Sequence, residues 1–267
     1  SFIVIFGIWK NNSHKNIQEY LKGGNKARWW TVGLSVMATQ ASAITFLSTP
    51  GQAYHDGMGF VHFYFGLPFA MLIICLFFIP VYHRLKVYTA YEFLEDRFNY
   101  FARAFGSLSF ILFQLGRIGI VLLLPALAIS IVSGIPVTTS ILLMGILCVL
   151  YTAFGGIEAV IWTDVIQVVV LMGGSLLAIF WIVFHTETSV TEMIAFASEQ
   201  NKFNLMNMEL NFTESTFWVV FIGGLASAMI TQGTDQTIVQ RYLTSKSLKN
   251  SRKTLYTNAL LTLPATI

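Results

Sequence analysis

The sequence of 267 residues is 55% hydrophobic and only 11% charged, with a formal net charge of +3. A soluble domain carries about 25% charged residues, so this composition argues against a soluble globular protein. Apolar stretches of about 20 residues, the length that crosses a bilayer as a helix, recur along the chain. Metalloprotease, phosphate-loop and nucleophile-elbow motifs are absent from the sequence. We therefore predict an all-α, multi-pass membrane protein that is not an enzyme.

Seven apolar segments follow one another along the chain, and an eighth begins near residue 257. The seven are residues 1–9, 29–53, 58–82, 104–133, 137–153, 159–184 and 215–234. The first, SFIVIFGIW, has neither a charged leading region nor a cleavage site, so it does not read as a signal peptide. Because the chain starts and stops inside apolar runs, we expect it to be a fragment of a longer protein.

Basic residues are confined almost entirely to alternate connections between these segments. Residues 10–28, 83–103 and 236–256 hold five, four and five of the sixteen Lys and Arg residues, and the exceptions are Arg117 and Lys202. Cytoplasmic loops of membrane proteins are enriched in Lys and Arg. We therefore place these three connections in the cytoplasm. The positive net charge then reflects membrane topology, and no nucleic-acid partner is expected.

This charge pattern predicts an inverted repeat. The segment at 29–53 runs outward from the cytoplasm, four segments follow it, and the segment at 215–234 runs inward. Opposed five-helix units are the architecture of leucine-transporter-like proteins, in which substrate and ions bind near the midplane beside broken helices. We expect one transporter domain over 1–267, with the first repeat at 29–184 and the start of the second at 215–267.

Two segments at corresponding positions of these repeats contain unusual polar or small residues. The stretch TVGLSVMATQASAITFLSTPGQAY, residues 31–54, is rich in hydroxyl and amide groups, and 223–236 contains three glycines. Unwound backbone is tolerated inside a membrane only where protein or a water-filled cavity receives its polar groups. We predict that residues 38–45 leave helical geometry and bind an alkali cation through oxygen atoms. The alternative is that these hydroxyls bond to their own helix or to neighbouring helices.

Arg117 and Asp164 are ionisable residues inside apolar segments. Arg117 lies roughly 20 Å from the cytoplasmic start of its segment, where an arginine costs at least ~2.5–3.5 kcal/mol. It either pairs with a buried acid such as Asp164 or faces a cavity as a fixed cation for a substrate carboxylate. Asp164 lies in the cytoplasmic third of its segment, as an interfacial carboxylate, a cation ligand or a proton carrier. Asp235 and Glu158 lie near segment ends, and we interpret both as interfacial charges.

Four motifs resemble the sodium:solute symporter family, and the resemblance covers essentially the whole chain. They are GLSVMATQASAITFLSTPGQAY, YTAYEFLEDRFN, YTAFGGIEAVIWTDVIQ and TDQTIVQRYL. The residues are most similar to those of bacterial sialic acid symporters. The resemblance implies the leucine-transporter fold with an extra helix before the first repeat, of which residues 1–9 would be the end. It also implies alternating access driven by sodium (Na+).

The resemblance further implies two sets of binding residues. The conserved sodium site would use the backbone carbonyls of Ala38 and Ala41, and Asp164 would belong to a second, more cytoplasmic sodium site. The substrate site would be formed by Gln40, Ser42, Thr45, Phe60, Tyr64 and Arg117. We also predict a substrate contact at Gly224 of the paired segment 223–236. Sialic acid symporters have a threonine in place of Gln40 and a glutamine in place of Tyr64, whereas Arg117 matches.

These observations predict a sodium-driven symporter of the inner or plasma membrane that imports a small organic solute. The solute would bear a carboxylate, as sialic acids and monocarboxylates do, and the partners would be this solute, sodium ions and the lipid bilayer. Three alternatives stay open: a proton-coupled carrier that uses Asp164, a sugar symporter, and a transporter-like sensor module. Sugar-transporting relatives have a glutamine in place of Thr45 and a tyrosine in place of Thr231, which disfavours a galactose-like substrate.

Overall fold

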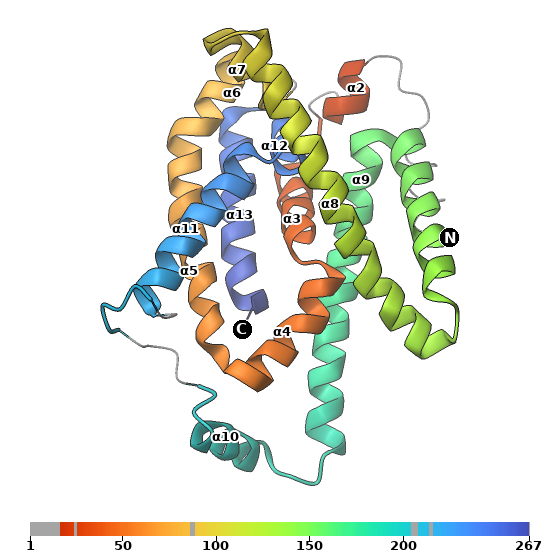
Figure 1. Ribbon diagram of the computed structural model, residues 1–267, viewed down its shortest axis with the longest axis vertical. Helices are drawn as coiled ribbons and strands as arrows, with labels where there is room; N and C mark the ends of the chain where they lie inside the picture. Colours follow the sequence, from red (N-terminus) through yellow and green to blue (C-terminus); the bar gives the residue numbers. More distant parts are fainter. Residues whose placement is uncertain (1–16, 24–25, 86–88, 204–207, 214–215, 267) are drawn as a thin grey trace.

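The computed structural model describes residues 17–23, 26–85, 89–203, 208–213 and 216–266 (Figure 1). Every named element in these ranges is a helix, which confirms the predicted all-α fold. The elements are α2 (Ile17–Lys22), α3 (Trp29–Gln40), α4 (Ala43–Asp56), η2 (Met58–Val61), α5 (His62–Ile73), η3 (Ile74–Phe78), α6 (Ile79–Leu85), α7 (Glu92–Arg97), α8 (Tyr100–Ser133), α9 (Val137–His185), α10 (Val190–Glu199), α11 (Phe217–Thr234), α12 (Gln236–Leu243) and α13 (Leu248–Thr266). Residues 1–9, predicted as the end of an extra helix, lie outside the described residues.

Several of these helices can cross a membrane. In the described part of the chain, four continuous helical stretches are long and apolar enough: Met58–Leu85, Tyr100–Ser133, Val137–His185 and Phe217–Thr234. A fifth span would combine α3 with α4, which are bent by 56° relative to each other. The chain is therefore a membrane protein, as its composition predicts.

α9 contains two of the predicted segments. A straight helix of its 49 residues would measure roughly 74 Å, more than twice the ~30 Å thickness of the hydrocarbon core. Gly156 interrupts it with φ 56° and ψ −164°, a conformation essentially restricted to glycine. Figure 1 shows the arms 137–155 and 157–185 extending down from this corner as an antiparallel pair. The predicted connection at 154–158 is thus reduced to one residue.

The core is formed where α3, α5, α11, α12 and α13 pack together. α5 and α11 cross with their backbones in contact, because a Cβ added to Gly224 would overlap the carbonyl of Phe63. A Cβ on Gly66 would likewise overlap the backbone of Leu225. Buried side chains from the surrounding helices, such as Met71 of α5, complete this cluster. The crossing fixes α11 against the first half of the chain.

The second predicted break lies later than expected. α11 stays helical through all three glycines of 223–236 and ends at Thr234. The chain turns at Asp235, whose φ of −67° and ψ of 117° are extended, and α12 then begins. The helix α13 also starts at Leu248, earlier than the predicted residue 257, because its first turns are polar and do not register as apolar sequence. The glycines of 223–236 therefore did not predict the position of the break, because Gly224 allows close packing of α11 against α5.

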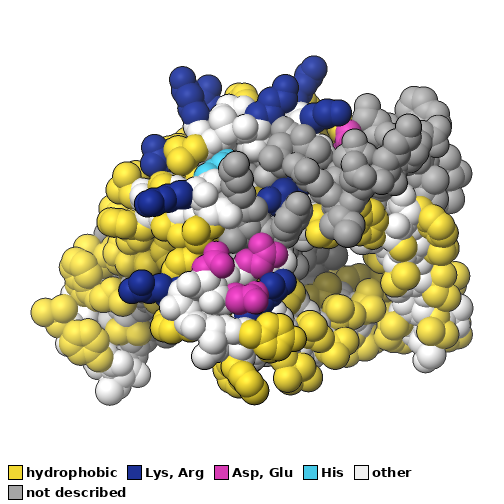
Figure 2. Space-filling view, turned by 90° about the horizontal axis from the view of Figure 1, so that it is seen from above, with side chains coloured by type: hydrophobic (Ala, Val, Ile, Leu, Met, Phe, Trp, Pro, Cys, Tyr) yellow, Lys and Arg dark blue, Asp and Glu magenta, His cyan; other side chains and the backbone are white. Residues whose placement is uncertain are grey.

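The basic residues collect at one end of the molecule. Figure 2 looks onto the end that carries α7 and α12 and shows Lys and Arg side chains gathered over it.

Lys202, one of the two exceptions in the charge pattern, lies after α10. Its Nζ donates to the carbonyl of His55 at 3.0 Å, and its own carbonyl accepts from the Met58 backbone nitrogen at 2.8 Å. This lysine therefore ties α10 to the end of α4.

Candidate ion and substrate site

The bend between α3 and α4 is a short break in the helix. Only Ala41 and Ser42 leave helical geometry, with φ and ψ of −77° and 80° for Ala41 and −86° and 165° for Ser42. The break is therefore narrower than the predicted segment 38–45. Ser42 begins the new helix, because its Oγ accepts a hydrogen bond from the Thr45 backbone nitrogen at 3.3 Å, as N-cap serines do.

This break changes the bonding of two backbone carbonyls. In a continuous helix, the oxygens of Ala38 and Ala41 would accept from the N–H groups of Ser42 and Thr45, four residues later. The Ser42 N–H instead donates to the Gln40 carbonyl at 3.0 Å, and the Thr45 N–H donates to the Ser42 hydroxyl. Both carbonyls thus lose their helical donors. Freed carbonyls of this kind coordinate sodium in broken-helix transporters.

Three of the predicted substrate contacts lie together at the break. Thr45 Oγ1 donates to the Gln40 carbonyl at 3.4 Å and lies 3.4 Å from Ser42 Oγ. Phe60 and Tyr64 follow on η2 and α5, and Arg117 lies on α8, which packs against α4. All six side chains are half-buried. Their role in substrate binding stays a prediction.

Gly224, the seventh predicted contact, has a different environment. It is buried, and the space that a side chain would need is filled by the backbone of Phe63. Its neighbour Gly223 has no atom within 4 Å of the corresponding position. The structure therefore gives Gly224 a packing function at the α5–α11 crossing, and a contact with substrate stays a prediction.

Arg117 pairs with Asp235 and not with Asp164. Its Nη1 lies 3.6 Å from Asp235 Oδ2, and the two side chains are 41% and 11% exposed. Asp235 caps α12, because its Oδ1 accepts from the Thr237 backbone nitrogen at 2.8 Å and from Thr237 Oγ1 at 2.6 Å. The interpretation of Asp235 as an ordinary interfacial charge was wrong, since the turn after α11 directs it toward α8.

Asp164 lies in a buried cluster that joins α3, α9 and α12. Its Oδ2 accepts hydrogen bonds from Ser35 Oγ at 2.5 Å and from Arg241 Nη2 and Nε at 3.0 and 3.2 Å. Arg241 Nε also lies 2.9 Å from Ser35 Oγ, and its Nη1 donates to the Thr237 carbonyl. Asp164 is therefore not an interfacial carboxylate, and its assignment as a sodium ligand stays a prediction.

Ser35 and Arg241 were not predicted from the sequence as partners of Asp164. Arg241 was counted with the cytoplasmic loop charges because it follows Asp235 by six residues. α12 nevertheless buries Ile238, Val239, Tyr242 and Leu243, and this face carries Arg241 inward with it. The helical spacing of these apolar residues in QTIVQRYL was the signal available in the sequence.

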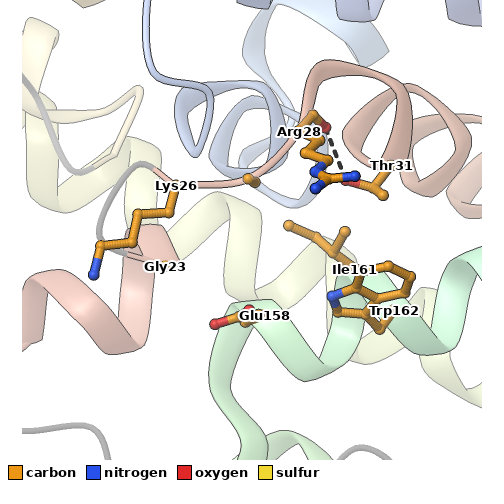
Figure 3. A pocket seen from close by; sticks show the side chains of 8 residues that line it. Gly23, Lys26, Arg28, Thr31, Glu158, Ile161 and Trp162 are labelled. Atoms are coloured by element: carbon orange, nitrogen blue, oxygen red, sulfur yellow. Dashed lines mark hydrogen bonds between the residues drawn. The ribbon is translucent and has the colours of Figure 1, made fainter. Parts of the chain in front are cut away.

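A cavity of about 360 Å³ opens at the basic end, beside the start of α3. Its lining combines cationic, acidic and apolar residues: Gly23, Lys26, Ala27, Arg28, Thr31, Glu158, Ile161 and Trp162. Figure 3 shows Arg28 facing Ile161 and Trp162, and its carbonyl accepts a hydrogen bond from Thr31 Oγ1 at 2.7 Å. The cavity contains none of the predicted substrate contacts, and its mixed charges favour no particular ligand.

The bent helix pair, the α9 hairpin and the α5–α11 crossing together define a helical membrane protein with backbone carbonyls freed at a mid-helix break. The model of the sodium:solute symporter family matches residues 20–266, and the chain belongs to this family. This membership confirms the resemblance seen in the sequence motifs. Members of the family couple transport to sodium.

The relatives include several sodium-coupled transporters. The sodium/sialic acid symporter SiaT of Proteus mirabilis (strain HI4320) is 38% identical over 263 residues, which are 97% of this chain and 52% of the relative. The human sodium-coupled monocarboxylate transporter 1 is 33% identical over 257 residues, covering 96% of this chain and 42% of the relative. This chain thus spans about half the length of the curated relatives it matches.

A solved structure shares the fold. It is the substrate-bound outward-open state of a Na+-coupled sialic acid symporter, with a TM-score of 0.93 and 35% sequence identity. The match covers 99% of this chain and 57% of that one. The predicted transporter fold is therefore confirmed over nearly all of this chain.

Proposed function

We propose that the protein is a sodium-coupled symporter of the inner or plasma membrane that imports a small organic solute bearing a carboxylate. The observation that carries this proposal is the break between α3 and α4, where the carbonyls of Ala38 and Ala41 lose their helical donors. Membership of a sodium-coupled family makes sodium the cation that such oxygens would bind. Binding and moving a solute needs no bond-breaking chemistry, so the proposed activity includes no catalytic step.

Coupling between ion and solute follows from their shared position on the chain. The proposed sodium ligands Ala38 and Ala41 alternate with the proposed substrate contacts Gln40 and Ser42. A sodium ion that orders this break would preorganise the substrate contacts, and by linkage the solute would raise sodium affinity by the same factor. Inward movement of each sodium charge contributes ~2.3 kcal/mol per 100 mV of membrane potential, before any concentration term.

The class of solute is inferred from Arg117. A guanidinium group is planar and binds a carboxylate through two parallel hydrogen bonds. Its 41% exposure leaves it open to a solute on the α8 side of the break. Relatives named for sialic acid and for monocarboxylates transport carboxylates, which supports this inference. Asp164 would serve a second sodium ion only if that ion displaced Arg241 from its carboxylate.

The test is uptake by the protein in proteoliposomes, with N-acetylneuraminic acid and L-lactate as probes. Sodium-driven uptake of a carboxylate is expected, and it should cease when choline replaces sodium at fixed pH. Arg117→Ala should abolish this uptake while leaving the amount of reconstituted protein unchanged. Uptake that persists in choline but follows a proton gradient would instead identify a proton-coupled carrier.

A further inference from the structure

In the described part of the chain, Arg117 forms one ion pair, and its partner is the carboxylate of Asp235. The contact between Arg117 Nη1 and Asp235 Oδ2 is 3.6 Å, which is an ion pair but too long for a hydrogen bond. The guanidinium therefore keeps its hydrogen-bonding fork available for a closer carboxylate. A bidentate pairing with such a group would add two charge-assisted hydrogen bonds that Asp235 does not make.

The two oxygens of Asp235 have separate tasks. Oδ1 accepts both hydrogen bonds from Thr237 and so caps α12, while Oδ2 faces Arg117. If Arg117 were withdrawn, the carboxylate would keep its two hydrogen bonds and its position at the positive end of the α12 dipole. The release of Arg117 would thus leave no uncompensated buried charge.

The surroundings of Asp235 hold it in place independently of Arg117. Gln236 Oε1, at the next residue, accepts from the Ala90 backbone nitrogen at 2.9 Å, and Tyr82 Oη donates to the Gly233 carbonyl at 2.8 Å. Burial and, to a smaller extent, the charge of Asp235 raise the pKa of Tyr91 to about 12. The hydrogen bonds of its neighbours hold the carboxylate in place, where it faces Arg117 from the turn between α11 and α12.

From this geometry we propose that Asp235 sets the affinity for acidic solutes, because it competes with the substrate carboxylate for Arg117. In the empty site Asp235 occupies the arginine, and an incoming carboxylate displaces it. The proposal rests on the proposed function, in which Arg117 binds the carboxylate of the solute. A neutral solute does not bind through Arg117 and therefore does not compete with Asp235, so the competition acts on acids alone. It would raise the apparent Kd for acids, which equals the intrinsic Kd divided by the fraction of time that Arg117 is free of Asp235.

The critical variant is Asp235→Asn. Asparagine keeps the volume and the Oδ1 acceptor that caps α12, and it caps helices about as well as aspartate. Only the negative charge toward Arg117 is lost. The matched control is Asp96→Asn, which removes the same charge from an exposed site on α7 at the same end of the molecule.

The experiment measures the Kd of purified protein for four ligands in saturating sodium. They are N-acetylneuraminic acid, L-lactate and the methyl ester of each. We expect Asp235→Asn to lower the Kd of the acid that binds by about 3- to 10-fold, because the competing anion is gone. The ester should bind no more tightly to this variant than to the parent, and Asp96→Asn should change neither Kd. Asp235→Glu keeps the negative charge, so an acid Kd equal to that of the parent protein would also support the competition.

The possible failures separate the two proposals. An acid Kd that is unchanged or raised in Asp235→Asn, while Arg117→Gln weakens acid binding, would overturn the competition alone. Equal effects on acid and ester would reduce Asp235 to a structural cap, which also overturns it. If neither acid binds the parent, or if Arg117→Gln leaves acid binding unchanged, the carboxylate role of Arg117 fails and the competition fails with it.

Discussion

Two ion pairs lie at the two ends of α12 and differ in the exposure of the arginine and in the length of the contact. Asp164 and Arg241 are 9% and 11% exposed and meet at 3.0 Å, with Ser35 bonded to both. Arg117 and Asp235 meet at 3.6 Å, and the arginine is 41% exposed. The first pair joins three helices through short hydrogen bonds, whereas the second is a single longer contact.

The difference indicates what each pair can do. A buried pair is expensive to break from one side, because the remaining charge stays in a low-dielectric environment. A pair whose arginine is 41% exposed contributes less to stability, and the exposed arginine is accessible to a second partner. The same short helix therefore carries a contact suited to holding helices together and a contact suited to binding.

The largest expected effect comes from Asp164→Ala, which leaves Arg241 buried without its carboxylate. The free energy of unfolding should fall by about 3–5 kcal/mol. Denaturant titration of the protein in detergent, followed by tryptophan fluorescence, measures the change. The double variant Asp164→Asn with Arg241→Gln should recover a large part of the loss, because it removes both charges. Equal stability of the single variant and the parent would contradict the assignment of this pair as a fixed connection.

Ser35→Ala tests whether the hydroxyl contributes to the tight pair. Hydrogen bonds to charged groups contribute about 1.5–3 kcal/mol, and a loss of this size is expected in the same titration. The control is Thr39→Ala, one turn later on α3, where the hydroxyl donates only to the Ser35 carbonyl. If both variants lost the same stability, the effect would belong to helix α3 in general and not to the ionic cluster.

Gly224→Ala tests the close packing of α5 against α11 without changing any charge. The added methyl group would overlap the backbone of Phe63, and overpacking of this kind costs about 1–3 kcal/mol. Gly223→Ala is the matched control, because nothing lies within 4 Å of its new methyl group. The melting temperature, measured by size-exclusion chromatography after heating, should be lower for Gly224→Ala than for Gly223→Ala. A tolerated Gly224→Ala would mean that α5 and α11 can move apart at low cost.

The smallest effect on stability is expected for Arg117→Gln. Loss of the half-exposed pair should change the free energy of unfolding by less than about 1 kcal/mol. The exposed pair between Arg103 and Glu95, whose side chains are each 38% exposed, gives a reference through Arg103→Gln. A loss of several kcal/mol in Arg117→Gln, measured by the same denaturant titration, would mean that both pairs are structural.

Much of the fold could be predicted from the sequence because apolar length and loop charge report directly on membrane insertion. The motifs around 38–45 and Asp164 also identified the family correctly. Partners distant in sequence could not be predicted in the same way. Arg241 follows Asp164 by 77 residues. The spacing of apolar residues in QTIVQRYL indicates that α12 has a buried face, but it does not reveal which distant residue Arg241 meets there. The glycines of 223–236 were misleading because close helix packing and helix breaking require the same small residue.

The corner at Gly156 has a mechanical consequence. Two membrane crossings meet there at a single buried residue, so there is no slack between them to absorb a relative displacement. The ends of the two arms at this corner therefore stay adjacent, whatever the angle between the arms. A deletion at this position has no loop to shorten and would have to unwind the end of one membrane-spanning arm.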